Sequence, residues 1–158
     1  MRILALDYGR KRIGVAVSDE LCLVARILTT IQSLGRNADA AVIAGLVQTQ
    51  AADRVILGLP LHLSGAQGAQ AGKVHKFGAY LATQLGVPVE YWDERFTSVE
   101  AARLLTQAGI HPRKQRDQID ATAAAILLQS YLDAHPHLQS AAFGGPGPGT
   151  GDREAETE

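Results

Sequence analysis

The sequence is poor in cysteine and in long apolar runs. Cys22 is the only cysteine among 158 residues, so the chain can form neither an internal disulfide nor a cysteine-based metal site. Its apolar context, LCLV, predicts a small buried side chain rather than a reactive thiol. No apolar stretch has the length of a membrane span, and the N-terminus MRILALDYG lacks the features of a signal peptide. We therefore expect no membrane partner and a cytoplasmic location.

The net charge is also small, and the charged residues are unevenly distributed along the chain. The formal net charge is -1 at pH 7, with 46% hydrophobic and 20% charged residues, which is ordinary for a globular protein. Residues 144–158 carry four acidic side chains and one basic one. This leaves residues 1–143 with two more basic than acidic side chains. Such a small excess is compatible with a polyanionic partner but does not require one.

The length of the chain suits a single domain. Residues 136–158 are rich in glycine and proline and then acidic, a composition that can bury little apolar surface. We therefore expect one folded domain over residues 1–134 and a disordered acidic tail over residues 135–158.

The pattern of apolar residues predicts an α/β fold. Three short apolar stretches joined by turns predict antiparallel strands at 3–6, 13–17 and 23–30. Helices and strands then alternate. Helices are expected at 37–50, 67–85, 97–108 and 116–134, and further strands at 54–59 and 87–92. This order predicts a five-stranded mixed sheet, three antiparallel strands and then two reached through helices, with helices on its faces.

Acidic residues follow the expected strands and open the last helix. Asp7 ends the first strand, Asp93 and Glu94 end the fifth, and Asp117 and Asp120 lie in the first turns of the last helix. If the first and fourth strands are neighbours, these carboxylates meet at one edge of the sheet. Their mutual repulsion is relieved by hard divalent cations such as Mg²⁺ or Mn²⁺. Singly, each acid also suits a structural role, as a strand-end turn residue or as a helix cap.

Basic residues accompany every candidate acid. Such residues can contact nucleic-acid phosphates, although any single one is more often a solvated loop residue. The candidates are Arg10, Lys11 and Arg12 after Asp7, Arg95 after Glu94, and Arg113, Lys114 and Arg116 before Asp120.

Four stretches together resemble the YqgF/RuvX family, which has an RNase H-like fold. They are LALDYGRKRIGVAVSD (4–19), VILGLPLHLSG (55–65), VEYWDERFTSVEA (89–101) and QIDATAAAILLQSYL (118–132). The resemblance implies a nuclease whose metal-binding acids correspond to Asp7, Glu94 and Asp120, and it aligns Asp120 rather than Asp117 with the last of them. We expect these acids to hold two Mg or Mn ions, with Asp117 as a secondary candidate. The implied substrate is structured nucleic acid, either four-way (Holliday) junction DNA or the 5′ end of precursor 16S ribosomal RNA. The loop at 61–65, His62-Leu63-Ser64-Gly65 after Leu61, departs from the family pattern.

The sequence is also compatible with two other classes of function. The hairpin LALDYGRKRIGVAV is similar to the phosphate-gripping hairpin of ATP-binding phosphotransferases, which need two such domains. A non-catalytic module that binds nucleic acid is the other alternative. A four-way junction has two-fold symmetry, so a resolvase would suit a homodimer, although the sequence identifies no dimer surface.

Overall fold

A computed structural model describes residues 1–60, 68–94 and 116–142, with only the backbone described for 116–119 and 140–142. The strands are β1 (Ile3–Tyr8), β2 (Arg12–Ser18), β3 (Ala25–Gln32), β4 (Arg54–Leu59) and β5 (Val89–Asp93). The helices are α1 (Arg36–Thr49), α2 (Ala69–Gln84), α4 (Arg116–Ala134) and α5 (His137–Ala142). None of the helices within these ranges combines the length and apolarity that a membrane span requires.

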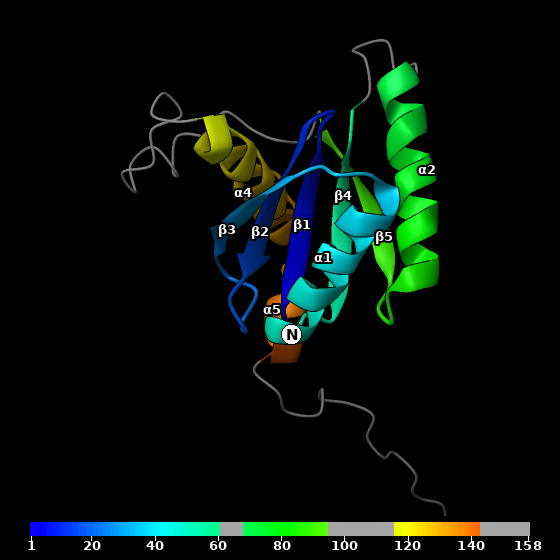
Figure 1. The fold of residues 1–158 in the computed structure, drawn as a ribbon. Coiled ribbons are helices and arrows are strands. Elements are labelled where there is room, and N and C mark those ends of the chain that lie inside the picture. The colour runs from blue at the N-terminus through cyan, green and yellow to red at the C-terminus, as the bar shows by residue number, and fades with distance from the viewer. Residues whose placement is uncertain (61–67, 95–115, 143–158) are drawn as a thin grey trace, which may run out of the picture.

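The strands form one five-stranded mixed sheet in the order β3-β2-β1-β4-β5. β1 pairs antiparallel with β2 and parallel with β4, and β5 pairs parallel with β4. The carboxyl ends of β1, β4 and β5 therefore lie at one edge of the sheet. Figure 1 shows this arrangement, with α1 and α2 in front of the sheet and α4 behind it.

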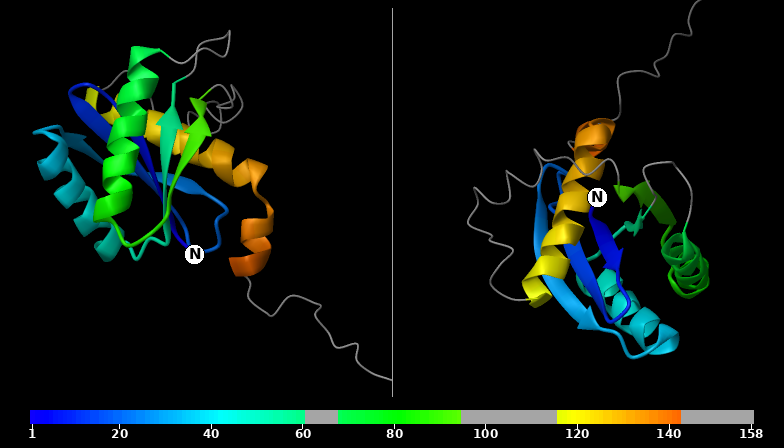
Figure 2. Two further views of the ribbon diagram at one scale, coloured as in Figure 1. Left: turned by 90° about the vertical axis from the view of Figure 1, so that its right-hand side faces the viewer. Right: turned by 90° about the horizontal axis from the view of Figure 1, so that it is seen from above.

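Alternation along the strands gives the sheet two apolar faces. Leu4, Leu6 and Val15 belong to the core under α1 and α2, whereas Ile3 and Ala5 belong to a second core under α4. The two layers of helices on opposite faces are seen from two sides in Figure 2. Because Asp7 follows Ala5 by two residues on β1, the alternation places it on the α4 face.

Small residues let α4 lie close to the sheet. A Cβ atom at Gly14 of β2 would overlap the main-chain carbonyl of Asp120 and lie 2.9 Å from the nitrogen of Ala121. Within α4, Ala124 and Ala125 are fully buried in the core on this face. The glycine thus determines how near the first turns of α4 come to β2.

Polar contacts fasten the C-terminal half of α4 to β4 and β5. The hydroxyl of Tyr131 accepts a hydrogen bond from Arg54 Nη1 at 2.7 Å and donates one to Glu90 Oε1 at 2.6 Å. Trp92 Nε1 donates to Ser130 Oγ at 3.1 Å. The strand that leads to Glu94 is therefore tied to the helix that carries Asp120.

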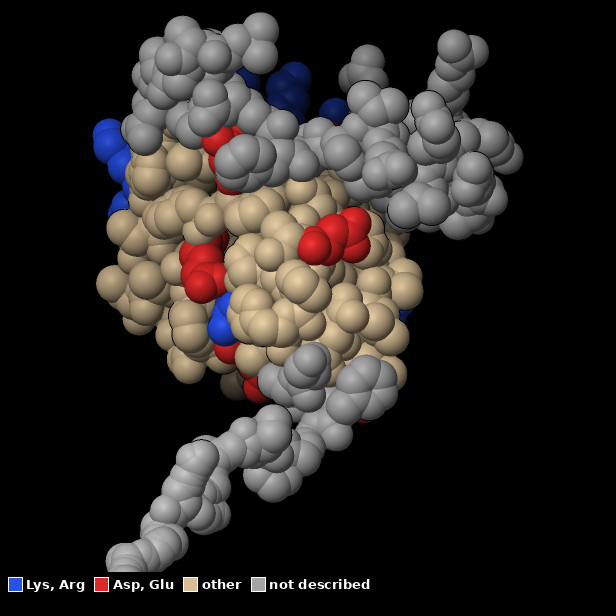
Figure 3. Space-filling view, turned by 180° about the vertical axis from the view of Figure 1, so that it is seen from behind, with Lys and Arg blue, Asp and Glu red and all other residues tan. Residues whose placement is uncertain are grey.

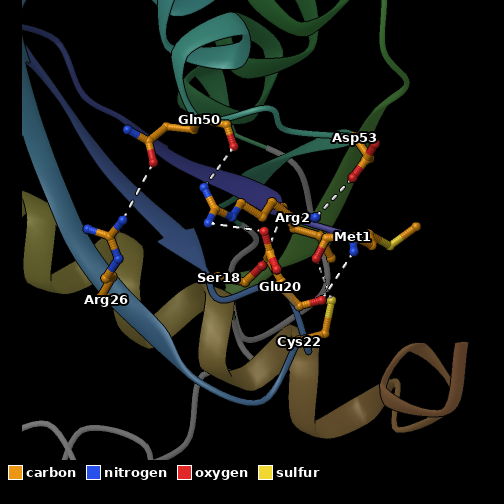
Figure 4. Close-up of polar contacts among 9 residues, drawn as sticks. Met1, Arg2, Ser18, Glu20, Cys22, Arg26, Gln50 and Asp53 are labelled. Atoms are coloured by element: carbon orange, nitrogen blue, oxygen red, sulfur yellow. Dashed lines mark hydrogen bonds and ion pairs between the residues drawn. The ribbon is translucent and has the colours of Figure 1, made fainter. Parts of the chain in front are cut away.

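The opposite end of the sheet is held by a network around Arg2 (Figure 4). Its main-chain nitrogen donates to Asp53 Oδ2 at 3.0 Å, and its guanidinium donates to Gln50 O at 3.2 Å and lies 3.5 Å from Glu20 Oε1. These contacts join the start of β1 to the end of α1 and to the β2–β3 connection. Cys22 is fully buried beside this network, as its apolar context predicted.

The structure departs from the sequence-based prediction at the end of the chain. The expected disordered tail began at residue 135, yet His137–Ala142 form α5. Leu138 is 5% exposed and joins the core under α4, which accounts for the order of this segment. The rest of the expected tail, residues 143–158, and the expected helix at 97–108 lie outside the described residues.

Candidate active site

Asp7 and Glu94 meet at the carboxyl edge of the sheet. Asp7 lies near the end of β1, and Glu94 directly follows β5, two strands away. The side chain of Glu94 reaches back over Gly58 of the intervening strand β4, where a Cβ atom would lie 2.8 Å from Glu94 Oε1. The carboxyl groups of Asp7 and Glu94 share a hydrogen bond. The absence of a side chain at Gly58 is what allows them to touch.

This pair lines a cavity of about 270 Å³ whose other walls come from α4. The wall residues are Ala123, Ile126 and Leu127. Burial in this setting, together with the neighbouring charges of Glu94 and Asp120, raises the pKa of Asp7 from 3.8 to about 7. Burial and the charge of Asp93 also raise the pKa of Glu94. Up to about neutral pH the pair therefore keeps a proton that a carboxyl group in water would already have lost.

The third predicted acid, Asp120, lies above the same face of the sheet but has a different partner. Arg12 Nε donates to Asp120 Oδ2 at 2.7 Å, and both side chains are about a quarter exposed, 26% and 28%. Asp120 acts on Asp7 through its charge. Within the described ranges, no three Asp, Glu, His or Cys side chains are grouped closely enough to hold one metal ion. Asp7 and Glu94 are brought together as expected, whereas Asp120 is turned toward Arg12.

Asp117 has a different position from the one that the sequence indicated. The sequence made it a candidate helix cap, but α4 begins at Arg116, so Asp117 lies inside the first turn. Its side chain lies outside what the structure describes, as does that of Arg116. The secondary assignment of Asp117 as a metal ligand stays a prediction.

The donor set suits a hard divalent cation. Asp7, Glu94 and Asp120 offer only carboxylate oxygens, the ligands that Mg²⁺ and Mn²⁺ prefer. Two carboxyl groups that share a proton in a partly buried cavity are also the arrangement that a cation relieves by replacing the proton. The residues present therefore fit such an ion.

A basic turn adjoins the acids. Gly9 N donates to Arg12 O at 2.9 Å, which closes the turn between β1 and β2 and leaves Arg10 and Lys11 exposed at its tip. A second hollow, of about 310 Å³, is lined by this turn and by Asp120. The other predicted basic residues, Arg95, Arg113 and Lys114, and the loop at 61–65 lie outside the described residues. Seen from the α4 side, acidic side chains stand at separate places on a largely uncharged surface (Figure 3).

The sequence did not indicate the roles of Gly14 and Gly58. Neither glycine stands out in the apolar pattern of its strand. Each one leaves space for another part of the chain, the main chain of Asp120 over Gly14 and the side chain of Glu94 over Gly58. The only signal available was a glycine inside an expected strand, which can mark close approach of other backbone.

Residues 1–134 match the family described as "RuvX: Holliday junction resolvase". The chain belongs to this family. A relative from Syntrophus aciditrophicus is 48% identical over 134 residues, which cover 85% of this chain and 89% of that protein. One from Myxococcus xanthus is 44% identical over 135 residues, with 85% and 89% covered. Both relatives are named as proposed pre-16S rRNA nucleases.

Solved structures confirm the predicted RNase H-like fold. RuvC from Thermus thermophilus matches with a TM-score of 0.58 at 16% identity, covering 85% of this chain and 96% of RuvC. The fowlpox virus resolvase, in complex with Holliday junction DNA, matches with a TM-score of 0.55 at 16% identity, covering 85% and 98%. At this identity the likeness concerns the fold, and it agrees with the five-stranded mixed sheet and its flanking helices.

Proposed function

We propose that this chain is a metal-dependent endonuclease that hydrolyses phosphodiester bonds in structured nucleic acid. The observation that carries the proposal is the Asp7–Glu94 pair in a cavity at the carboxyl edge of the sheet. Asp120 stands above the same face, on the helix that walls the cavity. Membership of the RuvX family supports this class of reaction over the phosphotransferase and non-catalytic alternatives.

Asp7, Glu94 and Asp120 would hold two Mg or Mn ions. When bound, such ions activate the attacking water and neutralise charge on the leaving oxygen of a phosphodiester. The proton shared by Asp7 and Glu94 has to leave for both carboxylates to act as ligands, so cation binding competes with that proton. This competition favours activity above the raised pKa of the pair.

The remaining side chains of the site would position the substrate. Arg10, Lys11 and Arg12 beside the cavity supply positive charge for phosphates on either side of the cleaved bond. Arg95, Arg113, Lys114 and Arg116 are proposed to extend this contact. The apolar wall of Ala123, Ile126 and Leu127 limits how much water reaches the carboxylate pair.

The substrate is proposed to be one of two kinds. The family description favours four-way junction DNA, and the names of the relatives favour precursor 16S rRNA, of which we propose the 5′ end. Purified protein with Mg²⁺ or Mn²⁺ should cleave at least one of them, and Asp7→Asn and Asp120→Asn should not. Cleavage at the wild-type rate by Asp7→Asn would refute the proposed site, and binding without cleavage would favour a non-catalytic module.

Junction resolution carries a further expectation about assembly and location. Symmetric cutting of a two-fold junction suits a homodimer, which light scattering on the purified protein with and without junction DNA would detect. A cytoplasmic location is proposed together with either substrate.

A further inference from the structure

Arg12, Gly14 and Asp7 form a compact arrangement under the first turns of α4. Arg12 and Gly14 are two residues apart on β2, so they share a face of the sheet. Asp7 of β1 lies directly opposite Gly14 in the antiparallel pair. The main chain of Asp120 crosses above Gly14. The side chain of Asp120 therefore starts from a point between two sets of possible partners. Arg12 lies on one side, and the pair of Asp7 and Glu94 lies on the other.

In the structure, Asp120 is on the Arg12 side. The guanidinium and carboxylate are 2.7 Å apart, a charge-assisted hydrogen bond of good geometry. The pair is not deeply buried, since each side chain is about a quarter exposed, 26% and 28%. Because both side chains still contact solvent, water screens this ion pair in part, which lowers the cost of exchanging partners.

The hollow beside Arg12 offers a competing partner. It is lined by Gly9, Arg10, Lys11, Arg12 and Asp120 and has a volume of about 310 Å³. Three cationic side chains around one hollow attract an anion, and a guanidinium binds phosphate in the same forked manner as it binds carboxylate. A backbone phosphate in this hollow would compete with Asp120 for Arg12.

We propose that Arg12 is a positioning residue that exchanges Asp120 for a backbone phosphate of the bound nucleic acid, which frees Asp120 to join Asp7 and Glu94 as a metal ligand. This inference rests on the proposed nuclease function. In the free protein, Arg12 keeps the third carboxylate away from the pair. Nucleic acid and divalent cation then assist each other's binding, and thermodynamic linkage requires the effect to be equal in both directions.

A phosphate-binding arginine without this exchange would behave differently. Its removal would weaken nucleic-acid binding and leave the dependence of cation affinity on nucleic acid unchanged. If the ion pair were merely structural, removing Arg12 would lower the stability of the protein. It would also leave the dependence of cation affinity on nucleic acid unchanged. The coupling between the two ligands is therefore the quantity that separates the three roles.

The test measures cation affinity by calorimetry with Ca²⁺, an oxygen-ligated cation, for free protein and for protein saturated with nucleic acid. Two probes are used, a four-way DNA junction and an RNA spanning the 5′ end of precursor 16S rRNA. We expect at least one probe to tighten Ca²⁺ binding to the wild type by about tenfold. In Arg12→Gln the free protein should already bind Ca²⁺ more tightly, and the coupling should shrink by about tenfold relative to the wild type.

Arg10→Gln is the matched control, because it removes the same charge from the same turn but from an exposed side chain. It should weaken nucleic-acid binding while keeping the coupling of the wild type. Arg12→Lys should keep part of the coupling, since lysine retains the charge without the fork. Adding Arg12→Gln to Asp120→Asn should change the coupling no further, because both variants break the same exchange.

An Arg12→Gln protein with the coupling of the wild type would overturn this inference. So would equal losses of coupling in Arg12→Gln and Arg10→Gln, because the effect would then be one of general charge. Failure of the wild type to bind either probe would instead overturn the proposed function. The probe that shows the coupling identifies which nucleic acid supplies the phosphate.

Discussion

Gly14→Ala tests whether the approach of α4 to β2 determines the geometry of the site. The added methyl group would overlap the main-chain carbonyl of Asp120 and lie 2.9 Å from Ala121 N. Backbone cannot yield as a flexible side chain does, so α4 has to move by about 1 Å or more to restore ordinary contact distances. Overpacking of this kind costs about 1–3 kcal/mol, and each kcal/mol lowers the Tm of a domain of this size by about 2–4 °C.

The displacement carries Asp120 away from Asp7 and Arg12, and misplacement of a catalytic group by about 1 Å can cost about 100-fold in rate. We therefore expect cleavage by Gly14→Ala, assayed well below its Tm, to fall by about 100-fold. Gly45→Ala on α1 is the control, because nothing lies within 4 Å of its added Cβ. That change should stabilise the helix by about 0.5–1 kcal/mol and leave cleavage unchanged. If Gly14→Ala keeps the Tm and rate of the wild type, the reasoning about close approach is refuted.

Three further predictions concern the acids and their surroundings. Since the pKa of Asp7 rises from 3.8 to about 7 on folding, its contribution to stability is present below about pH 4 and is lost as the pH rises through 7. In EDTA, the Tm should therefore fall more between pH 5 and pH 8.5 for the wild type than for Asp7→Asn, and parallel pH profiles would contradict this. Gly58→Ala places a Cβ 2.8 Å from Glu94 Oε1 and 3.0 Å from Leu127 Cδ2, so cleavage should fall by about tenfold or more, and an unchanged rate would show that Glu94 does not need this space. Asp120→Asn should abolish cleavage. Asp117→Asn should retain part of the activity and lower the free energy of unfolding by about 1 kcal/mol or less in denaturant unfolding, since it removes a negative charge near the N-terminus of α4. The reverse pattern of rates would move the metal-ligand assignment to Asp117.

The sheet and the Asp7–Glu94 pair could be predicted because they depend on local patterns and one general rule. Apolar runs with short turns define the first three strands, and parallel strands bring their carboxyl ends to one edge. The predicted strand at 54–59 coincides with β4, and the predicted helix at 116–134 coincides with α4. Strand order places Asp7, Asp93 and Glu94 at this edge, and the family resemblance selects Glu94 from the last two, so no knowledge of side-chain contacts was needed.

The partner of Asp120 could not be predicted in this way. The periodicity of α4 shows that it is a helix, but its crossing point on the sheet depends on the missing side chain at Gly14. Arg12 and Asp120 are 108 residues apart, and only that crossing point brings them together. The order of α5 was missed for a related reason, since composition favoured disorder while burial of Leu138 under α4 stabilises the segment.

The late position of α4 in the chain has a consequence for synthesis. Domains fold from the N-terminus as the ribosome extends the chain by about 5–20 residues per second. All five strands of the sheet have been made by residue 93, whereas α4, which packs on the face formed by Ile3, Ala5 and Ile56, begins only at residue 116. The nascent chain thus contains Asp7 and Glu94 before it contains the helix that walls the cavity and carries the third carboxylate. A protein proposed to cut nucleic acid, ribosomal RNA among the candidates, would accordingly complete its active site only after nearly the whole domain has been translated.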